Sequence, residues 1–154
     1  MMLGALTVAG LPLPAATQSP TNGAAEVSVL RPNANTLVYR ADPNGHFTID
    51  GNANGAPLRF LVDTGATLVV LTPSDARAAG IDPNDLVFDT AMRTANGTVP
   101  AAVTVLRELR VGRISLGDVR AAVVAKAPQS VLGMSFLSRL KGFEMQHDRL
   151  TLSW

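Results

Sequence analysis

The chain has 154 residues, of which 47% are hydrophobic, and its formal net charge is +1 at pH 7. One domain with a buried core is therefore expected, and the scattered basic residues form no electrostatic footprint for nucleic acid or an anionic membrane surface. The sequence contains no cysteine, which excludes disulfides, a thiol nucleophile and a thiolate metal site.

The first 36 residues differ in composition from the rest. Residues 1–16 are apolar or small and uncharged, and a stretch rich in Pro, Ser, Thr, Asn and Gly follows to about Asn35. Residues 1–16 are too short for a membrane span, and they lack the basic residues that precede the apolar core of a secretory signal. We interpret residues 1–36 as an apolar leader (a signal or anchor remnant) with a flexible linker, and residues 37–154 as the folded domain. An apolar terminus without a targeting role is the alternative.

From Leu37 onward, short apolar runs alternate with turn signals, a pattern typical of small all-β domains. Turns and strands are predicted to alternate over residues 42–45, 46–50, 52–55 and 57–62. They form a hairpin that leads directly into Asp63. After another apolar run, Thr72 suits a helix N-cap, Asp75 the acidic place of a capping box, and Gly80 the end of that helix.

The downstream half is predicted to contain a projecting hairpin, further strands and a second helix. Between Val87 and Val105, two extended runs flank Asn96-Gly97, a strong signal for a two-residue hairpin turn. The remaining elements are strands at 108–111 and 119–125 around a turn region with Gly112 and Gly117, a helix at 134–140 ended by Gly142, and a strand at 150–154. The sheet is expected to be mostly antiparallel.

The most informative motif is residues 60–67, Phe-Leu-Val-Asp-Thr-Gly-Ala-Thr. An apolar strand delivers the carboxylate of Asp63 into a tight turn at Gly65, with the hydroxyls of Thr64 and Thr67 on either side. Asp63 could instead be an ordinary turn residue that caps its own backbone. An isolated Asp-Thr-Gly is a weak signal, but this octet followed by two apolar residues and a glycine at residues 131–133 is a much stronger one.

These motifs occur in the order seen in the retropepsin-like aspartic proteases. The sequence resembles the bacterial single-domain group of that family, which is related to retroviral proteases, over about the last 110 residues. The resemblance also includes Gly45-His46-Phe47 and residues 131–137. It implies an all-β fold, the retropepsin-like acid protease half-barrel, with one or two short helices and the active site at a homodimer interface.

The resemblance implies roles for individual residues. Asp63 would be the catalytic carboxylate, and Thr64 would make hydroxyl hydrogen bonds across the dimer. The other expected site residues are Gly65, Ala66 and Thr67 in the active-site loop, Ala95, Asn96 and Gly97 at the tip of a flap over the substrate, and Val131, Leu132 and Gly133 under the loop. Viral relatives have an aspartate where this chain has Thr67 and an arginine where it has Met134-Ser135, so the ion pair that helps the viral dimer hold together is absent.

The single Asp-Thr-Gly motif predicts assembly, because the chemistry needs two facing carboxylates. The expected function is an aspartic endopeptidase, in which two Asp63 carboxylates, one per subunit of a homodimer, activate a water molecule that hydrolyses a peptide bond. A retropepsin-like dimerisation or peptide-binding module with weak or no catalysis is the alternative. A third possibility is a zymogen-like state in which the leader occludes the cleft.

The expected partners are a second copy of the chain and an extended peptide or protein substrate. No cofactor and no metal are expected, because His46 and His147 lack any ligand spacing. The leader favours the bacterial periplasm or the inner membrane as the location, with membrane association through the N-terminal segment, and the cytoplasm stays open.

Overall fold

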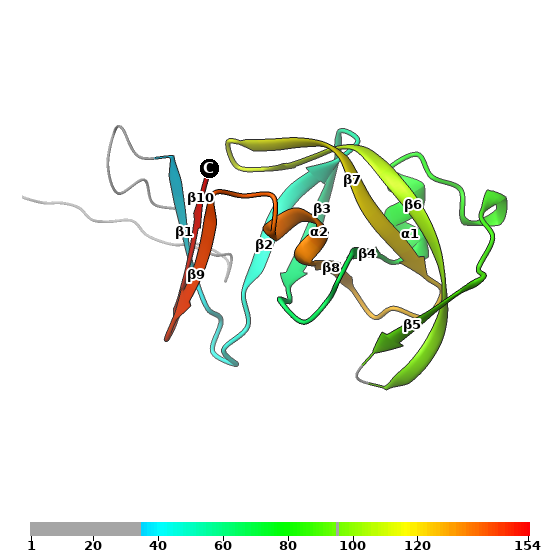
Figure 1. The fold of residues 1–154 in the computed structure, drawn as a ribbon, viewed down its shortest axis with the longest axis horizontal. Helices are drawn as coiled ribbons and strands as arrows, with labels where there is room; N and C mark the ends of the chain where they lie inside the picture. The colour runs from blue at the N-terminus through cyan, green and yellow to red at the C-terminus, as the bar shows by residue number, and fades with distance from the viewer. Residues whose placement is uncertain (1–34, 95) are drawn as a thin grey trace, which may run out of the picture.

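The computed structural model describes residues 35–94 and 96–154, which form a mostly β fold with short helices (Figure 1). The strands are β1 (Thr36–Arg40), β2 (Thr48–Ala53), β3 (Ala56–Val62), β4 (Val69–Leu71), β5 (Thr90–Thr94), β6 (Gly97–Val111), β7 (Ile114–Val124), β8 (Ser130–Leu132), β9 (Gly142–Gln146) and β10 (Arg149–Ser153). The helices are α1 (Pro73–Ala78), the 3₁₀ helix η3 (Pro83–Asp85) and α2 (Met134–Leu137).

The strands form two sheets, as expected for an all-β protein. The smaller sheet has the order β1-β10-β9 and stands at one side of the molecule (Figure 1). The larger sheet has the order β2-β3-β8-β4-β7-β6-β5, and β2 also pairs with β6, so the sheet curls into a barrel-like form. The prediction of a mostly antiparallel sheet is confirmed, and the two parallel pairs are β3 with β8 and β4 with β7.

The hairpin of β2 and β3 positions the start of the candidate site. Asn54 and Gly55 form its turn with φ of 51° and 88°. Positive φ at both central residues is what the common type I′ hairpin turn requires. Ile49 and Phe60 alternate inward from the two strands and are 0% exposed. Since β3 ends at Val62, the anchored hairpin fixes the point at which Asp63 leaves the sheet.

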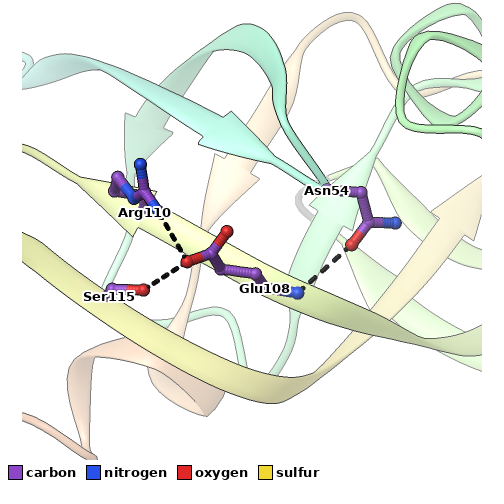
Figure 2. Close-up of polar contacts among 4 residues, drawn as sticks. All are labelled: Asn54, Glu108, Arg110 and Ser115. Atoms are coloured by element: carbon purple, nitrogen blue, oxygen red, sulfur yellow. Dashed lines mark hydrogen bonds and ion pairs between the residues drawn. The ribbon is translucent and has the colours of Figure 1, made fainter.

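Asn54 also joins this hairpin to β6 and α1. Its side-chain oxygen accepts a hydrogen bond from the amide of Glu108 (3.2 Å), as Figure 2 shows, and its side-chain nitrogen donates to the carbonyl of Ala79 (3.0 Å). The carboxylate of Glu108 in turn accepts from Ser115 (2.5 Å) and Arg110 (2.8 Å) (Figure 2). These two hydrogen bonds, that of Ser115 first, lower the pKa of Glu108.

The apolar side chains form two separate clusters. The main core lies among both sheets and the helices, and its largest fully buried members include Phe60, Phe136 and Ile49. The second apolar cluster consists of the buried residues Val70, Ala101, Ala122 and Val124 with the partly buried residues Leu68, Met92, Val99, Ala127 and Val131. Packing on both faces of the large sheet explains why β4 and the last four residues of β7 are continuous apolar runs.

The β6–β7 hairpin differs from the prediction. The predicted strand at 108–111 is the end of β6, which runs unbroken from Gly97, and β7 already begins at Ile114. Gly112 lies in the turn with a φ of 57°, whereas Gly117 lies inside β7 opposite Glu108. The prediction placed both glycines in the turn because sequence alone does not show which of them needs a left-handed backbone.

The C-terminal region was also partly mispredicted. The helix predicted at 134–140 ends at Leu137, where the hydroxyl of Ser138 donates to the carbonyl of Met134 (2.5 Å). β9 was not predicted, since Phe-Glu-Met-Gln lacks a β-branched pattern and is held as a strand by its pairing with β10.

In the part of the chain that the structure describes, no helix has the length and apolar character needed to cross a membrane. The predictions for the apolar leader and most of the linker fall on residues 1–34, which lie outside the described residues. The domain boundary at residue 37 stays a prediction.

Candidate active site

The loop of residues 63–68 joins β3 to β4 and carries the predicted catalytic carboxylate. Asp63, Thr64 and Thr67 are all exposed on it. The Oδ1 atom of Asp63 accepts a hydrogen bond from the amide of Gly65 (2.8 Å), and its carbonyl accepts from the amide of Ala66 (3.2 Å). The aspartate therefore both caps its own turn and presents its carboxylate to solvent.

Gly65 lies in this turn, but its backbone is outside the left-handed region. A Cβ atom at this position would lie 3.2 Å from Oδ1 of Asp63. The residue is thus favoured by the close approach of the carboxylate to its amide, and a positive φ plays no part.

The segment that follows β8 supports the loop from beneath. The amide of Asp63 donates to the carbonyl of Leu132 (3.1 Å), and the amide of Met134 donates to the carbonyl of Ala66 (2.8 Å). Between these two contacts, a Cβ atom on Gly133 would lie 2.2 Å from the carbonyl oxygen of Leu68. Only glycine fits such an approach without a backbone shift. The structure therefore brings the predicted Val131, Leu132 and Gly133 together with the Asp63 loop.

The electrostatic surroundings of Asp63 are sparse within one subunit. Among the described residues its carboxylate takes part in no ion pair, and its Oδ2 atom has no hydrogen-bond partner. The hydroxyls of Thr64 and Thr67 likewise have no partner in the described part of the chain. No three His, Cys, Asp or Glu side chains within residues 35–94 and 96–154 are grouped so that they could hold a metal ion.

The β5–β6 hairpin holds the predicted flap residues. Thr94 pairs with Gly97, so Gly97 already belongs to β6 and the turn comes one residue earlier than the predicted tip at Asn96 and Gly97. Ala95 lies outside the described residues. The hydroxyl of Thr94 donates to the carbonyl of Gly97 (2.8 Å) and accepts from the amide of Asn96 (3.2 Å). This hairpin and the loop after β3 both lie in the lower half of Figure 1.

The second apolar cluster links the base of that hairpin to the Asp63 loop. Met92 on β5 and Val99 on β6 pack in the same cluster as Leu68, Val70 and Val131. Sequence reasoning missed Leu68, Met92 and Val99 as site residues, although the alternation of Val99, Ala101 and Val103 along β6 was a usable signal. Through Leu68, the cluster connects the base of this hairpin to the loop that carries Asp63.

A surface depression lies away from the Asp63 loop. Its volume is about 580 Å³, and it is lined by Asp50, Gly51, Asn52, Pro57, Leu58, Arg59, Asp75 and Gly112. Most of these residues lie in β2 and in the first half of β3, whereas Asp63 follows the end of β3. Both of its carboxylates already have partners, because Asp50 is paired with Arg59 at 2.8 Å and Asp75 accepts a hydrogen bond from Ser130 at 2.5 Å. It is therefore not the candidate site.

A β-hairpin that delivers an Asp-Thr-Gly turn, a glycine segment packed beneath that turn and a projecting second hairpin define a retropepsin-like fold. Residues 49–139, more than half of the chain, match the family described as gag-polyprotein putative aspartyl protease. The chain belongs to this family.

Curated relatives share much of the sequence. The chain is 43% identical over 111 residues to an uncharacterized protein in the cobV 5′ region of Sinorhizobium sp, covering 71% of this chain and 48% of the relative. It is 37% identical over 119 residues to an uncharacterized protein of Rickettsia prowazekii (strain Madrid E), covering 77% of this chain and 51% of the relative. The chain thus spans about half the length of the curated relatives that it matches.

Solved structures agree with the fold. A retropepsin-like aspartic protease from Rickettsia conorii superposes with a TM-score of 0.69 at 34% identity, covering 76% of this chain and 98% of that one. The EIAV protease, solved in complex with an inhibitor, superposes with a TM-score of 0.55 at 23% identity, covering 66% of this chain and 93% of that one. The predicted all-β, retropepsin-like fold is therefore confirmed.

Proposed function

We propose that the protein is an aspartic endopeptidase that acts as a homodimer, with one Asp63 from each subunit in a shared active site. The observation that carries the proposal is the exposed carboxylate of Asp63, held by its own loop over the tightly packed Gly133 segment. Family membership supports the class of activity.

The chemistry follows from bringing two such carboxylates together. Like charges a few ångströms apart oppose the ionisation of both groups, so the pair shares one proton, which is the known behaviour of aspartic proteases as a class. The ionised carboxylate accepts a proton from a bound water, and the protonated one donates to the scissile carbonyl. Water attacks directly, so no covalent intermediate forms. The exposed Asp63, whose Oδ2 is without a partner in the described subunit, suits this role.

The neighbouring threonines support the dimer. The hydroxyl of Thr64 is exposed and has no hydrogen-bond partner in the described residues. In a two-fold arrangement the same loop of the partner would supply donors and acceptors to it. The loop also lacks the viral ion pair, because Thr67 and Met134 are uncharged, so backbone and hydroxyl contacts would hold the two loops together.

The substrate is proposed to be an extended peptide with apolar residues on both sides of the cleaved bond. The second apolar cluster supports this, since Leu68, Val99 and Val131 are only partly buried in the subunit. A two-fold dimer presents equivalent apolar surfaces to both halves of the peptide. Asn96 and Gly97 are exposed at the end of the β5–β6 hairpin, and this end would close over the peptide as a flap.

The experiment compares the wild type with Asp63→Asn on a diverse peptide library at several pH values. Asp89→Asn is the matched control, because Asp89-Thr90-Ala91 repeats the motif superficially, and Asp89 is also exposed next to a threonine hydroxyl at 3.3 Å. The expected result is cleavage by the wild type and by Asp89→Asn, with a bell-shaped pH profile on the acidic side, and loss of cleavage in Asp63→Asn. Cleavage retained by Asp63→Asn, or a rate that is flat from acid to alkaline pH, would refute the mechanism.

Sedimentation tests the assembly. The active species should sediment as a dimer at micromolar and higher concentrations, and an active monomer would contradict the proposal. No cleavage by the wild type, with a dimer still present, would favour a peptide-binding module instead.

A further inference from the structure

Two serine hydroxyls flank β4, the short strand that follows the Asp63 loop. The amide of Val69, at the beginning of β4, donates to Oγ of Ser135 (2.9 Å), and the amide of Thr72, just after β4, donates to Oγ of Ser130 (3.2 Å). Ser130 begins β8 and Ser135 lies in α2. The segment from β8 to α2, which packs under the Asp63 loop, therefore also forms hydrogen bonds with both ends of β4.

Each hydroxyl also donates to a further element. Ser135 donates to the carbonyl of Arg120 on β7 (2.7 Å), and Ser130 donates to Oδ2 of Asp75 on α1 (2.5 Å). Each serine therefore accepts one hydrogen bond and donates another, which fixes the orientation of its hydroxyl. Ser130 is 1% exposed, so the loss of its hydroxyl would leave the amide of Thr72 without a partner in a dry environment.

The second bond modifies the predicted capping box of α1. The amide of Asp75 donates to the hydroxyl of Thr72 (3.0 Å), as predicted for the N-cap. In a standard capping box the amide of Thr72 would donate to the side chain of Asp75. Here the Thr72 amide donates to the hydroxyl of Ser130 instead, and this hydroxyl donates to Asp75. A serine from β8 is thus inserted into the capping box, and it ties the beginning of α1 to the strand under the active-site loop.

β4 needs these bonds because its backbone pairing is limited. It pairs with β8 only at Val70 and Val131 and runs parallel to β7 over its three residues. By contrast, the strand that enters the loop, β3, pairs with β2 along nearly its whole length. The N-terminal end of the Asp63 loop is therefore held by the long pairing of β3 with β2. Its C-terminal end is held by the short strand β4 and the side chains of Ser130 and Ser135.

We propose that Ser130 and Ser135 are positioning residues that set the register of β4 and so hold the Asp63 loop in its productive geometry within each subunit. The catalytic consequence rests on the proposed peptidase function. Catalysis is sensitive to displacements of about 1 Å in a reacting group, and a shift of β4 would move residues 64–68. The two hydroxyls bond to the backbone of residues 69, 72 and 120 and to the side chain of Asp75, and not to the carboxylate of Asp63. Their effect should therefore fall on turnover more than on substrate binding.

The catalytic test uses Ser130→Ala, Ser135→Ala and the rescue variant Ser135→Thr. Ser138→Ala is the matched control, because Ser138 is exposed and its hydroxyl donates only within α2, to the carbonyl of Met134. The two alanine variants should lower kcat at least about tenfold while KM changes by less than about twofold. The pH profile should keep its shape, Ser135→Thr should recover most of the rate, and Ser138→Ala should match the wild type. Unchanged kcat in folded Ser130→Ala and Ser135→Ala would overturn the proposal, as would an equal loss in Ser138→Ala.

A second measurement does not depend on activity. Amide hydrogen exchange followed by NMR should show faster exchange at Val69 in Ser135→Ala and at Thr72 in Ser130→Ala, with Phe60 unaffected. Unchanged exchange at Val69 and Thr72 would overturn the inference even in an active enzyme. If the wild type cleaves no peptide, the proposed function fails, and the exchange data still decide whether the serines hold β4. Ser135→Cys, which keeps the shape of the side chain with a weaker acceptor, replaces Ser135→Ala if that variant does not fold, with the same expected direction.

Discussion

Gly133→Ala is the substitution for which the structure predicts the largest local conflict. The added methyl group would lie 2.2 Å from the carbonyl oxygen of Leu68 and 2.8 Å from that of Ala66. A carbon and a carbonyl oxygen normally approach to about 3.3 Å, so the backbone of the loop must move by about 1 Å. Because both obstacles are backbone atoms of the active-site loop, no side-chain rotation relieves the clash.

The magnitude follows from two effects. Overpacking of a well-packed site costs about 1–3 kcal/mol, and the loss of the hydrogen bond from the Met134 amide to Ala66 adds about 1 kcal/mol. We therefore expect Gly133→Ala to lower the free energy of unfolding by about 2–4 kcal/mol, measured by urea denaturation with circular dichroism. Peptidase activity should fall even in the folded fraction, since the displaced backbone is that of the Asp63 loop.

The matched control is Gly117→Ala. Gly117 lies inside β7, and its added methyl group would be 3.5 Å from the carbonyl oxygen of Arg107, which is an ordinary contact. A change of less than about 1 kcal/mol is expected for this variant. Equal stability losses in Gly133→Ala and Gly117→Ala would refute the reasoning, because the close packing beneath the loop would then have no energetic consequence.

Three further predictions concern stability and titration. Burial raises the pKa of Tyr39, the single tyrosine, from 10.0 to about 12. The stabilisation from its neutral form, on the order of 3 kcal/mol, is complete below pH 10 and lost as the pH rises to about 12. Alkaline unfolding followed by phenolate absorbance checks this, and Tyr39→Phe should flatten the loss. Asn54→Ala should lower the free energy of unfolding by about 2–3 kcal/mol in urea denaturation, because it removes the hydrogen bonds to Ala79 and Glu108 and places a methyl group at a φ of 51°. Asn54→Gly should lower it less, because glycine accepts this φ. Ser115→Ala should raise the pKa of Glu108 toward its ordinary value in an NMR titration, because the Ser115 hydrogen bond is the main cause of its lowering.

The elements that were predicted correctly are those fixed by local chemistry. Asn54-Gly55 marks a hairpin turn because few residues accept a left-handed backbone, and Asn96-Gly97 marks the second hairpin to within one residue. Thr72 and Pro73 begin α1 through a cap and a fixed φ that also depend only on neighbouring residues.

The elements that were missed depend on partners distant in sequence. β9 is a strand because β10 pairs with it, and no property of Phe-Glu-Met-Gln indicates that pairing. Ser130 and Ser135 look like ordinary loop and helix residues until the fold places them beside Thr72 and Val69. The second apolar cluster likewise becomes visible only when β5 and β6 are packed against β4 and β8.

The candidate site also combines features that neighbouring residues determine with features that depend on distant parts of the chain. The Asp63 turn was identified from eight consecutive residues, and the structure places Val131, Leu132 and Gly133 directly beneath it. The catalytic role of Asp63, the homodimer, and the leader with its proposed location remain predictions.

The most direct test of the central claim mixes wild-type and Asp63→Asn subunits. After subunit exchange at constant total concentration, the proposal predicts that peptidase activity follows the square of the wild-type fraction, because each active site needs an Asp63 from both subunits. An equimolar mixture should therefore retain about one quarter of the wild-type activity. Activity proportional to the wild-type fraction, about one half in the same mixture, would show that each subunit acts with its own Asp63 and would contradict the shared active site.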